Sequence, residues 1–326
     1  MKTRFDEGIR VMDSKLVTIF GGTGFLGRHT VRALAKAGWR IKVAARRPAR
    51  GFYLRPLGQV GQIDFVKCDV ADAGQVAAAV AGSDAVINLC GILFQRGQSF
   101  EDVQANGAAN IAEAAAAAGV GALVHVSAIG ADKDSDAVYA QTKAAGEARL
   151  REFFPAATIL RPSIVFGPED DFFNRFAAMA RMSPILPLVG GGKTLFQPVF
   201  VGDVAAAIVT ALGSEAAKGA TYELGGPTVY SFKQLLQIVL TQTGRKRLLV
   251  PLPFGMASFQ AFFLQLLPKP PLTPDQVKLL KSDNVVAHDA KTLADLGIAA
   301  NSVEAEVPAY LWRYRAKGEY AALPVQ

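Results

Sequence analysis

The sequence predicts a doubly wound parallel α/β sheet with a smaller C-terminal α/β lobe. Short β-rich apolar runs alternate with longer helical patterns, and a glycine-rich turn follows the first run. Hydrophobic side chains make up 51% of the 326 residues, which is enough for a large core. Strand, helix and strand at this spacing imply right-handed crossovers, and such crossovers produce a parallel sheet.

Six apolar runs are the expected strands of this sheet. They are LVTIF (16–20), IKVAA (41–45), IDFVKC (63–68), AVINLC (85–90), ALVHVS (122–127) and ATILRPSIVF (157–166). Helical patterns such as LGRHTVRALAKAG and QANGAANIAEAAAAAG lie between them. We expect residues 15–163 and 196–226 to form the first domain, and residues 164–195 and 227–326 to form the C-terminal lobe.

The first strand runs into a glycine-rich turn, GGTGFLG, before a helix. Gly21 suits a tight turn, Gly24 permits close approach of the backbone to a pyrophosphate, and Gly27 permits close helix packing. The helix N-terminus then offers free N–H groups and the positive end of its dipole to the phosphates. The strand–turn–helix context therefore predicts a dinucleotide-binding Rossmann domain, with a bare structural turn as the alternative.

The end of the second strand distinguishes NAD from NADP. NAD enzymes usually carry an acidic residue there, about twenty residues beyond the glycines, which binds the ribose 2′-hydroxyl. This chain has Arg46 and Arg47 instead. Guanidinium groups match a 2′-phosphate, so the pair predicts NADP(H); solvated surface arginines are the alternative.

The segment HVSAIGADKDSDAVYAQTK, residues 125–143, has the residues of a proton-transfer site. In an enzyme, Tyr139 would exchange a proton with a substrate hydroxyl or carbonyl, while Lys143 would lower the pKa of that tyrosine and hold the nicotinamide ribose. Four residues apart on a helix, both side chains face the cofactor. Ser127, at the strand end, is the candidate hydroxyl that polarises the substrate oxygen.

Several motifs together resemble the extended short-chain dehydrogenase/reductases of the epimerase/dehydratase superfamily. These motifs are GGTGFLG, CDV, NLCG, YAQTK, LRPSIVFGP and PVFVGDVAAAI, and they cover roughly residues 16–226. More narrowly, LRPSIVFGPEDDFFNRFA, the two arginines and the apolar C-terminal part are similar to the nucleotide-binding accessory subunits of respiratory complex I. That resemblance implies a tightly held NADPH without established turnover, and neighbouring complex I subunits of the quinone-reducing arm as partners.

The chain departs from the resembling enzymes near Ser127. The resemblance places the catalytic hydroxyl a step or two beyond the fifth strand, where this chain has Ala128 and Ile129. Loss of one such donor weakens transition-state stabilisation by ~3 kcal/mol, whereas Tyr139 and Lys143 still bind ribose without it. A nucleotide clamp is therefore favoured. A soluble NADP-dependent reductase or epimerase of a sugar nucleotide or other carbonyl substrate stays the alternative.

The remaining cofactor contacts follow from position in the fold. Asp69, after the third strand, is expected to bind the adenine amino group or to cap the next helix, and residues Pro162 to Val165 should pass under the nicotinamide. The full expected set is Gly21, Thr23, Gly24, Phe25, Leu26, Gly27, Arg46, Arg47, Asp69, Val70, Leu89, Cys90, Gly91, Ser127, Tyr139, Lys143, Pro162 and Ile164. No Cys/His cluster has metal-ligand spacing, so we expect no metal.

The segment PFGMASFQAFFLQLLPKPP, residues 253–271, has an unusual apolar pattern. Five large apolar residues fall at helical spacing on one broad face: Phe259, Phe262, Phe263, Leu266 and Leu267. An amphipathic helix over 254–267 is too short to span a bilayer but could lie on a membrane surface or dock on a partner; a core helix of the C-terminal lobe is the alternative.

The net charge of +7 suits an acidic partner such as a nucleotide or an anionic membrane surface. The basic residues are scattered and no recognition module is present, which argues against nucleic acid. Together with the resemblance, this predicts a peripheral protein on the cytoplasmic face of a bacterial respiratory membrane or on the matrix face of a mitochondrial one.

Overall fold

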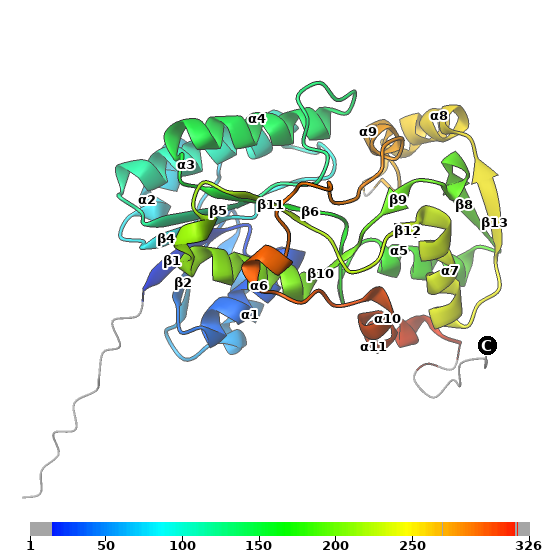
Figure 1. Ribbon diagram of the computed structural model, residues 1–326, viewed down its shortest axis with the longest axis horizontal. Coiled ribbons are helices and arrows are strands. Elements are labelled where there is room, and N and C mark those ends of the chain that lie inside the picture. The colour runs from blue at the N-terminus through cyan, green and yellow to red at the C-terminus, as the bar shows by residue number, and fades with distance from the viewer. Residues whose placement is uncertain (1–14, 269, 317, 319–326) are drawn as a thin grey trace, which may run out of the picture.

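A seven-stranded parallel sheet forms the centre of the computed structural model, which describes residues 15–268, 270–316 and 318. Its order is β11-β6-β5-β4-β1-β2-β3 (Figure 1). The strands are β1 (Leu16–Phe20), β2 (Arg40–Ala45), β3 (Ile63–Lys67), β4 (Ala85–Asn88), β5 (Ala122–Val126), β6 (Thr158–Pro162) and β11 (Thr221–Leu224). The predicted doubly wound α/β fold is confirmed.

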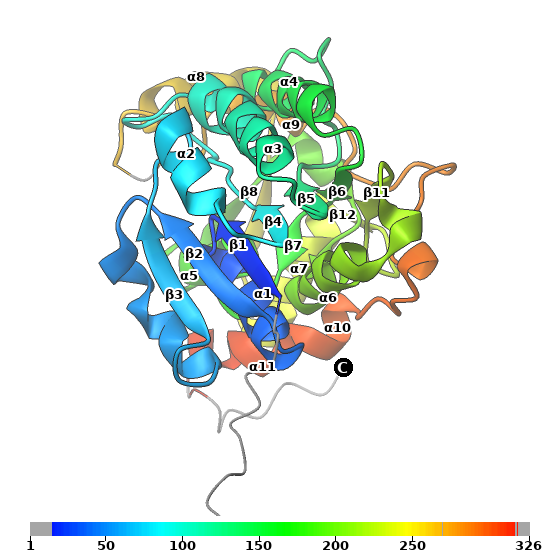
Figure 2. The same cartoon turned by 90° about the vertical axis from the view of Figure 1, so that its left-hand side faces the viewer.

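Helices cover both faces of this sheet (Figure 2). On one face lie α1 (Phe25–Lys36) and α6 (Val201–Gly213), whose apolar side chains share a core with the inward residues of β1 and β2. On the other face lie α2 (Ala73–Val80), α3 (Gly107–Ala117) and α4 (Val138–Phe153). Successive strand residues point to opposite faces, so near-continuous apolar strands are what a sheet covered on both sides requires.

The second lobe has its own small sheets and apolar core. Its elements, together with the strands that lead into it, are β7 (Val165–Phe166), α5 (Phe173–Met182), β8 (Ile185–Val189), β9 (Leu195–Phe196), β10 (Val199–Phe200), β12 (Tyr230–Ser231), α7 (Phe232–Thr243), β13 (Leu248–Leu252), α8 (Phe254–Leu264), α9 (Pro274–Leu279), α10 (Val303–Glu306) and α11 (Pro308–Leu311). The domain boundaries stay a prediction, and residues 319–326 of the predicted lobe lie outside the described residues. Leu293, Leu296 and Ile298, predicted in this lobe, pack against the core of the first.

One predicted strand is wrong in extent. The run 157–166 divides into β6 and β7, and β7 pairs with β10 instead of continuing in the main sheet. At the break, the side-chain oxygen of Asn284 accepts hydrogen bonds from the Ser163 hydroxyl (2.6 Å) and the Ile164 amide (3.2 Å). A side chain 120 residues away in the sequence thus accepts the backbone hydrogen bond that a neighbouring strand would otherwise accept.

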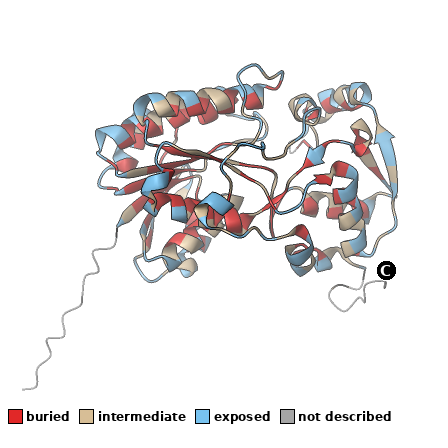
Figure 3. Ribbon diagram, viewed as in Figure 1, coloured by how far each residue is buried: buried red, intermediate tan, exposed pale blue. Residues whose placement is uncertain are grey.

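The helix α8 has small residues inside and large ones outside. Ala257 and Ala261 are buried against Val189 and Val277, whereas its large apolar side chains are mostly exposed (Figure 3). The exposed set is Met256, Phe259, Phe262 and Phe263, followed by Leu266 and Leu267. The core-helix alternative is therefore wrong. An apolar patch of this kind marks an interaction site.

The predicted helical range 254–267 is also too long, because α8 ends at Leu264. Pro268 follows closely, and a proline disfavours helical conformation in the residue before it. Within the described part of the chain, we find no helix with the length and apolar character needed to cross a bilayer.

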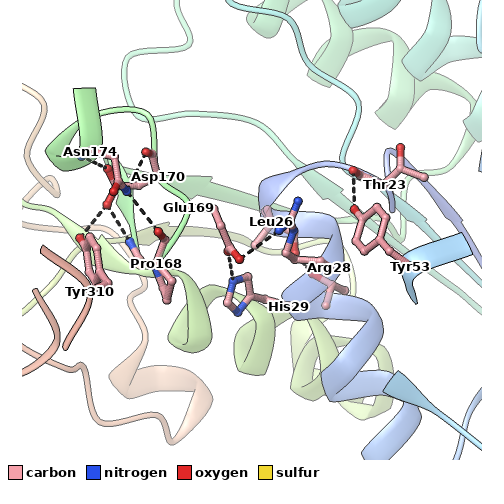
Figure 4. Close-up of polar contacts among 12 residues, drawn as sticks. Thr23, Leu26, Arg28, His29, Tyr53, Pro168, Glu169, Asp170, Asn174 and Tyr310 are labelled. Atoms are coloured by element: carbon pink, nitrogen blue, oxygen red, sulfur yellow. Dashed lines mark hydrogen bonds and ion pairs between the residues drawn. The ribbon is translucent and has the colours of Figure 1, made fainter. Parts of the chain in front are cut away.

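A buried carboxylate ties α11 to the loop between β7 and α5 within the second lobe. One oxygen of Asp170 accepts hydrogen bonds from the Tyr310 hydroxyl (2.6 Å) and the Gly167 amide (3.1 Å), as Figure 4 shows for the tyrosine. Burial raises the pKa of Asp170, and these hydrogen bonds act in the opposite direction.

We expect Tyr310→Phe to lower the free energy of unfolding by about 2 kcal/mol, because it leaves a buried carboxylate oxygen short of a donor. Urea denaturation followed by circular dichroism measures this change. Tyr314→Phe, on a partly exposed tyrosine nearby, is the matched control and should stay within about 0.5 kcal/mol of wild type. Equal stability of the two variants would contradict the assigned role of Asp170.

Candidate nucleotide-binding site

A cavity of about 410 Å³ opens at the carboxyl ends of β1 to β4, where doubly wound sheets bind ligands. It is lined by Gly21, Thr23, Gly24, Phe25, Leu26, Gly27, Ala44, Ala45, Arg46, Cys68, Asp69, Val70, Leu89, Cys90, Gly91, Ile92, Gln98 and Val103. Twelve residues of the predicted cofactor set are therefore brought together here. The predicted Arg47, Ser127, Tyr139, Lys143, Pro162 and Ile164 are not among the lining residues.

The glycine turn has the geometry that its residues predict. Gly21 has a φ of +78°, a conformation that side chains rarely adopt. A Cβ atom on Gly27 would lie 2.5 Å from the carbonyl oxygen of Gly21 and from Gly22. The first turn of α1 therefore packs directly on the turn, with its N-terminus directed at the cavity.

Side chains that the sequence reading did not identify support this turn from outside. The Tyr53 hydroxyl donates a hydrogen bond to the Thr23 carbonyl (2.8 Å), and the Arg28 guanidinium lies 5.1 Å from the centre of the Tyr53 ring. Figure 4 shows Glu169, from the loop after β7, beside Arg28 (3.0 Å) and His29 (3.4 Å). These contacts link α1 to the second lobe. No local motif signals them, because the partners lie up to 141 residues apart.

The two candidate arginines occupy different places. Both are exposed, but only Arg46 lines the cavity. Arg46 also lines an adjoining cavity of about 320 Å³, together with Ile92, Leu93, Phe94, Arg96 and Gln98. Of the two predicted arginines, only Arg46 lines the cavities, and Arg96 is a further cation beside it that the sequence did not indicate.

Asp69 does not cap the helix that follows it, which was the alternative role expected for this residue. The side chain that caps α2 is that of Asp72, which accepts a hydrogen bond from the Gln75 amide (3.0 Å). One oxygen of Asp69 accepts from the Ala71 amide (3.2 Å). Asp69 also lines the cavity, and its role as a contact for the adenine amino group stays a prediction.

Tyr139 and Lys143 lie on α4, and Lys143 lies close to Gly91 of the cavity wall. The Lys143 ammonium donates a hydrogen bond to the Val126 carbonyl (3.2 Å) and lies 3.3 Å from the position of a Cβ atom on Gly91. Burial lowers the pKa of Lys143 to about 8. Burial also raises the pKa of Tyr139 to about 12, away from the range useful for proton transfer.

The residues present fit a dinucleotide. The Ser127 hydroxyl is buried and has no hydrogen-bond partner among the described residues, so a ribose hydroxyl close to it would satisfy a costly orphan group. The turn and the helix N-terminus would hold the pyrophosphate, Arg46 the 2′-phosphate, and Lys143 the second ribose. A bound nicotinamide supplies hydride chemistry.

Comparison with known proteins agrees with this geometry. Residues 17–225 match the NAD dependent epimerase/dehydratase family. The chain belongs to this family. The resemblance predicted from the motifs is therefore confirmed, and the epimerase/dehydratase model covers the whole seven-stranded sheet except its first residue and extends one residue beyond β11.

Relatives of this epimerase/dehydratase chain include subunits of mitochondrial NADH dehydrogenase (ubiquinone). It is 36% identical over 320 residues to NADH dehydrogenase (ubiquinone) 1 alpha subcomplex subunit 9, mitochondrial, of Arabidopsis thaliana, which covers 93% of this chain and 79% of the relative. The Mus musculus protein of the same name is 36% identical over 304 residues, covering 92% and 80%. The NADPH-dependent quinone oxidoreductase of Escherichia coli, solved with NADPH, has the same fold, with a TM-score of 0.71 and 20% identity over 90% of this chain and 99% of that one.

The affinity for NADPH is expected to fall up to about tenfold between pH 7 and pH 9. Burial places the pKa of Lys143 near 8, so its ammonium is charged below that pH and neutral above it, where its bond to the ribose weakens. Cys68 and Cys90 stay protonated in this window, because burial raises their pKa values to about 11 and about 12.

Fluorescence titration of NADPH at several pH values measures this dependence. Lys143→Met is the control: it should bind more weakly at pH 7 and show no midpoint near pH 8. A midpoint that persists in this variant would assign the titration to another group.

Proposed function

We propose that this protein is an NADPH-binding accessory subunit of respiratory complex I, NADH:ubiquinone oxidoreductase, in which the nucleotide has a structural role. The observation that carries the proposal is the likeness to subunits of that enzyme over 92–93% of the chain, both lobes included. A protein that shared only the nucleotide domain would align over the first lobe alone. The second lobe is where a subunit would have its distinctive contacts.

Three features support NADPH held without turnover. Arg46 at the cavity supplies the charge that a 2′-phosphate needs and that a plain hydroxyl does not. The pKa of Tyr139 is raised to about 12 by burial, and among the described residues no cationic group counters this shift. Ala128 and Ile129 offer no side-chain hydroxyl where the resembling enzymes carry one. Tyr139 and Lys143 then act as a clamp on the nicotinamide ribose.

The surface of α8 supports a peripheral position at the junction of the quinone-reducing arm and the bilayer, on the cytoplasmic or matrix face. Phe259 and Leu266 are 66% and 80% exposed, which is unfavourable in water. Arg245, Lys246 and Arg247 precede β13, the strand that leads into α8. Exposed aromatic and aliphatic side chains on one helix are typical of helices that lie in a membrane interface.

Isolation of the chain from its native membranes tests the proposal. We expect it to sediment with the membranes, to co-purify with large subunits of the respiratory enzyme, and to release close to one NADPH per chain on denaturation. Recovery of a free protein without nucleotide would refute it.

The exposed apolar residues of α8 should be needed for attachment. We expect the triple variant Phe259→Ser, Phe262→Ser and Phe263→Ser to move most of the protein from the membrane pellet to the supernatant, with NADPH affinity unchanged. Val60→Ser with Phe153→Ser, which alters exposed apolar residues of the first lobe, is the control and should stay in the pellet. Retention of the triple variant would exclude α8 as the attachment surface.

An NADP-dependent reductase or epimerase of a sugar nucleotide or other carbonyl substrate is the second candidate. The buried, unpartnered hydroxyl of Ser127, near Lys143, favours it. Purified protein would then oxidise NADPH with some member of a carbonyl panel at an ordinary enzyme rate, and Tyr139→Phe would abolish that activity. Absence of turnover in the nucleotide-loaded protein supports the subunit.

A further inference from the structure

The segment that follows α8 returns from the second lobe to the nucleotide side, and we call residues 268–284 the clasp. Its first contact is at Pro268, whose carbonyl accepts a hydrogen bond from the Arg96 guanidinium (2.6 Å). Arg96 and Arg46 both line the adjoining cavity of about 320 Å³. The clasp therefore begins at the adenine end of the predicted site.

The central contact of the clasp is made by Asp275 of α9. Its two carboxylate oxygens accept hydrogen bonds from the backbone amides of Val138 (2.8 Å) and Tyr139 (3.0 Å). These amides belong to the first turn of α4, and Ala137, at the N-cap position, has no side chain able to bond them. A carboxylate from the second lobe thus caps the helix that carries Tyr139 and Lys143, where it also meets the positive end of the helix dipole.

Two further contacts fasten the same region. The Lys278 ammonium donates a hydrogen bond to the Asp136 carbonyl (2.9 Å), just before α4. The side-chain amide nitrogen of Asn284 (Nδ2) donates a hydrogen bond to the Ile129 carbonyl (3.3 Å), in the loop after β5. The contacts of the clasp on the first lobe therefore end on the loop after β4, the loop after β5 and the start of α4.

We propose that Asp275 is a positioning residue through which the second lobe sets the nucleotide site. It fixes the first turn of α4, and with it the Tyr139 side chain and, one turn later, the Lys143 ammonium. The inference rests on the proposed binding of NADPH, and it adds that the affinity for NADPH depends on a residue that touches no nucleotide. No local sequence pattern indicates this contact, since Asp275 and Tyr139 are 136 residues apart.

Substitution of Asp275 tests the inference. We expect Asp275→Ala to weaken NADPH binding about fivefold, the effect of losing one typical cap. Asp275→Asn keeps one acceptor oxygen and should give an intermediate affinity. Asp289→Asn, on an exposed aspartate shortly after the clasp, is the matched control and should bind as wild type. Hydrogen exchange of the Val138 and Tyr139 amides, measured without nucleotide, should be faster in Asp275→Ala.

The outcomes separate this inference from the proposed function. Faster amide exchange with unchanged NADPH affinity would make Asp275 a simple cap and overturn the inference, while the proposed function stands. Unchanged exchange in Asp275→Ala would overturn it as well. Failure of the wild-type protein to bind NADPH would overturn both.

Discussion

Replacing Gly27 by alanine is expected to weaken NADPH binding at least about 100-fold. The added Cβ atom would lie 2.5 Å from the Gly21 carbonyl oxygen and from the backbone of Gly22. Both neighbours are backbone atoms, so the turn or the helix must move to relieve the overlap. Overpacking of this kind also costs about 1–3 kcal/mol of stability. A displaced turn no longer presents the α1 N-terminus to the pyrophosphate.

Isothermal titration with NADPH, together with thermal denaturation, measures both effects of this change. Gly213→Ala is the matched control, because that glycine ends α6 and a Cβ atom there meets no heavy atom within 4 Å. Its affinity should equal that of wild type, with a stability change of no more than about 1 kcal/mol. Wild-type affinity in Gly27→Ala would mean that the turn does not hold the nucleotide.

Replacing Arg46 by alanine is expected to weaken NADPH binding about 10- to 100-fold and NADH binding less than about threefold. A charge-assisted hydrogen bond contributes about 1.5–3 kcal/mol, and only NADPH carries the 2′-phosphate. Competition titrations of NADPH and NADH on the same preparation measure the ratio of the two affinities, which should fall in the variant.

Arg47→Ala makes the same change of charge one residue away and is the control. Because Arg47 does not line the cavity, its effect should be small, and the double variant should behave as Arg46→Ala alone. Equal losses for NADPH and NADH would contradict the phosphate assignment.

Local patterns predicted much of the fold and the phosphate end of the site. The first five expected strands coincide with β1 to β5 to within one or two residues at their ends, because buried strands have near-continuous apolar runs. The glycine turn was predictable since its requirements are met within seven residues. The cavity is also lined by Ala44, Ala45 and Cys68, which were not predicted. Their positions at the ends of strands are the signal that could have identified them.

Contacts between distant segments were not predictable. The break after β6 depends on Asn284, and the cap on α4 depends on Asp275, each more than 100 residues away. The short strand β11 has only four residues, too few for a clear pattern. For α8, periodicity predicted a helix but could not tell which face is buried, and the small residues Ala257 and Ala261 proved to face inward.

The edge strand β11 has a consequence for biosynthesis. It is one of the two edge strands of the central sheet, yet it is translated after β8, β9 and β10 of the other lobe. A nascent chain therefore exposes the unpaired edge of β6 until Leu224 leaves the ribosome, and such edges invite aggregation. The exposed edge of β6 therefore needs a chaperone during translation. A truncated protein that ends before β11 should be insoluble.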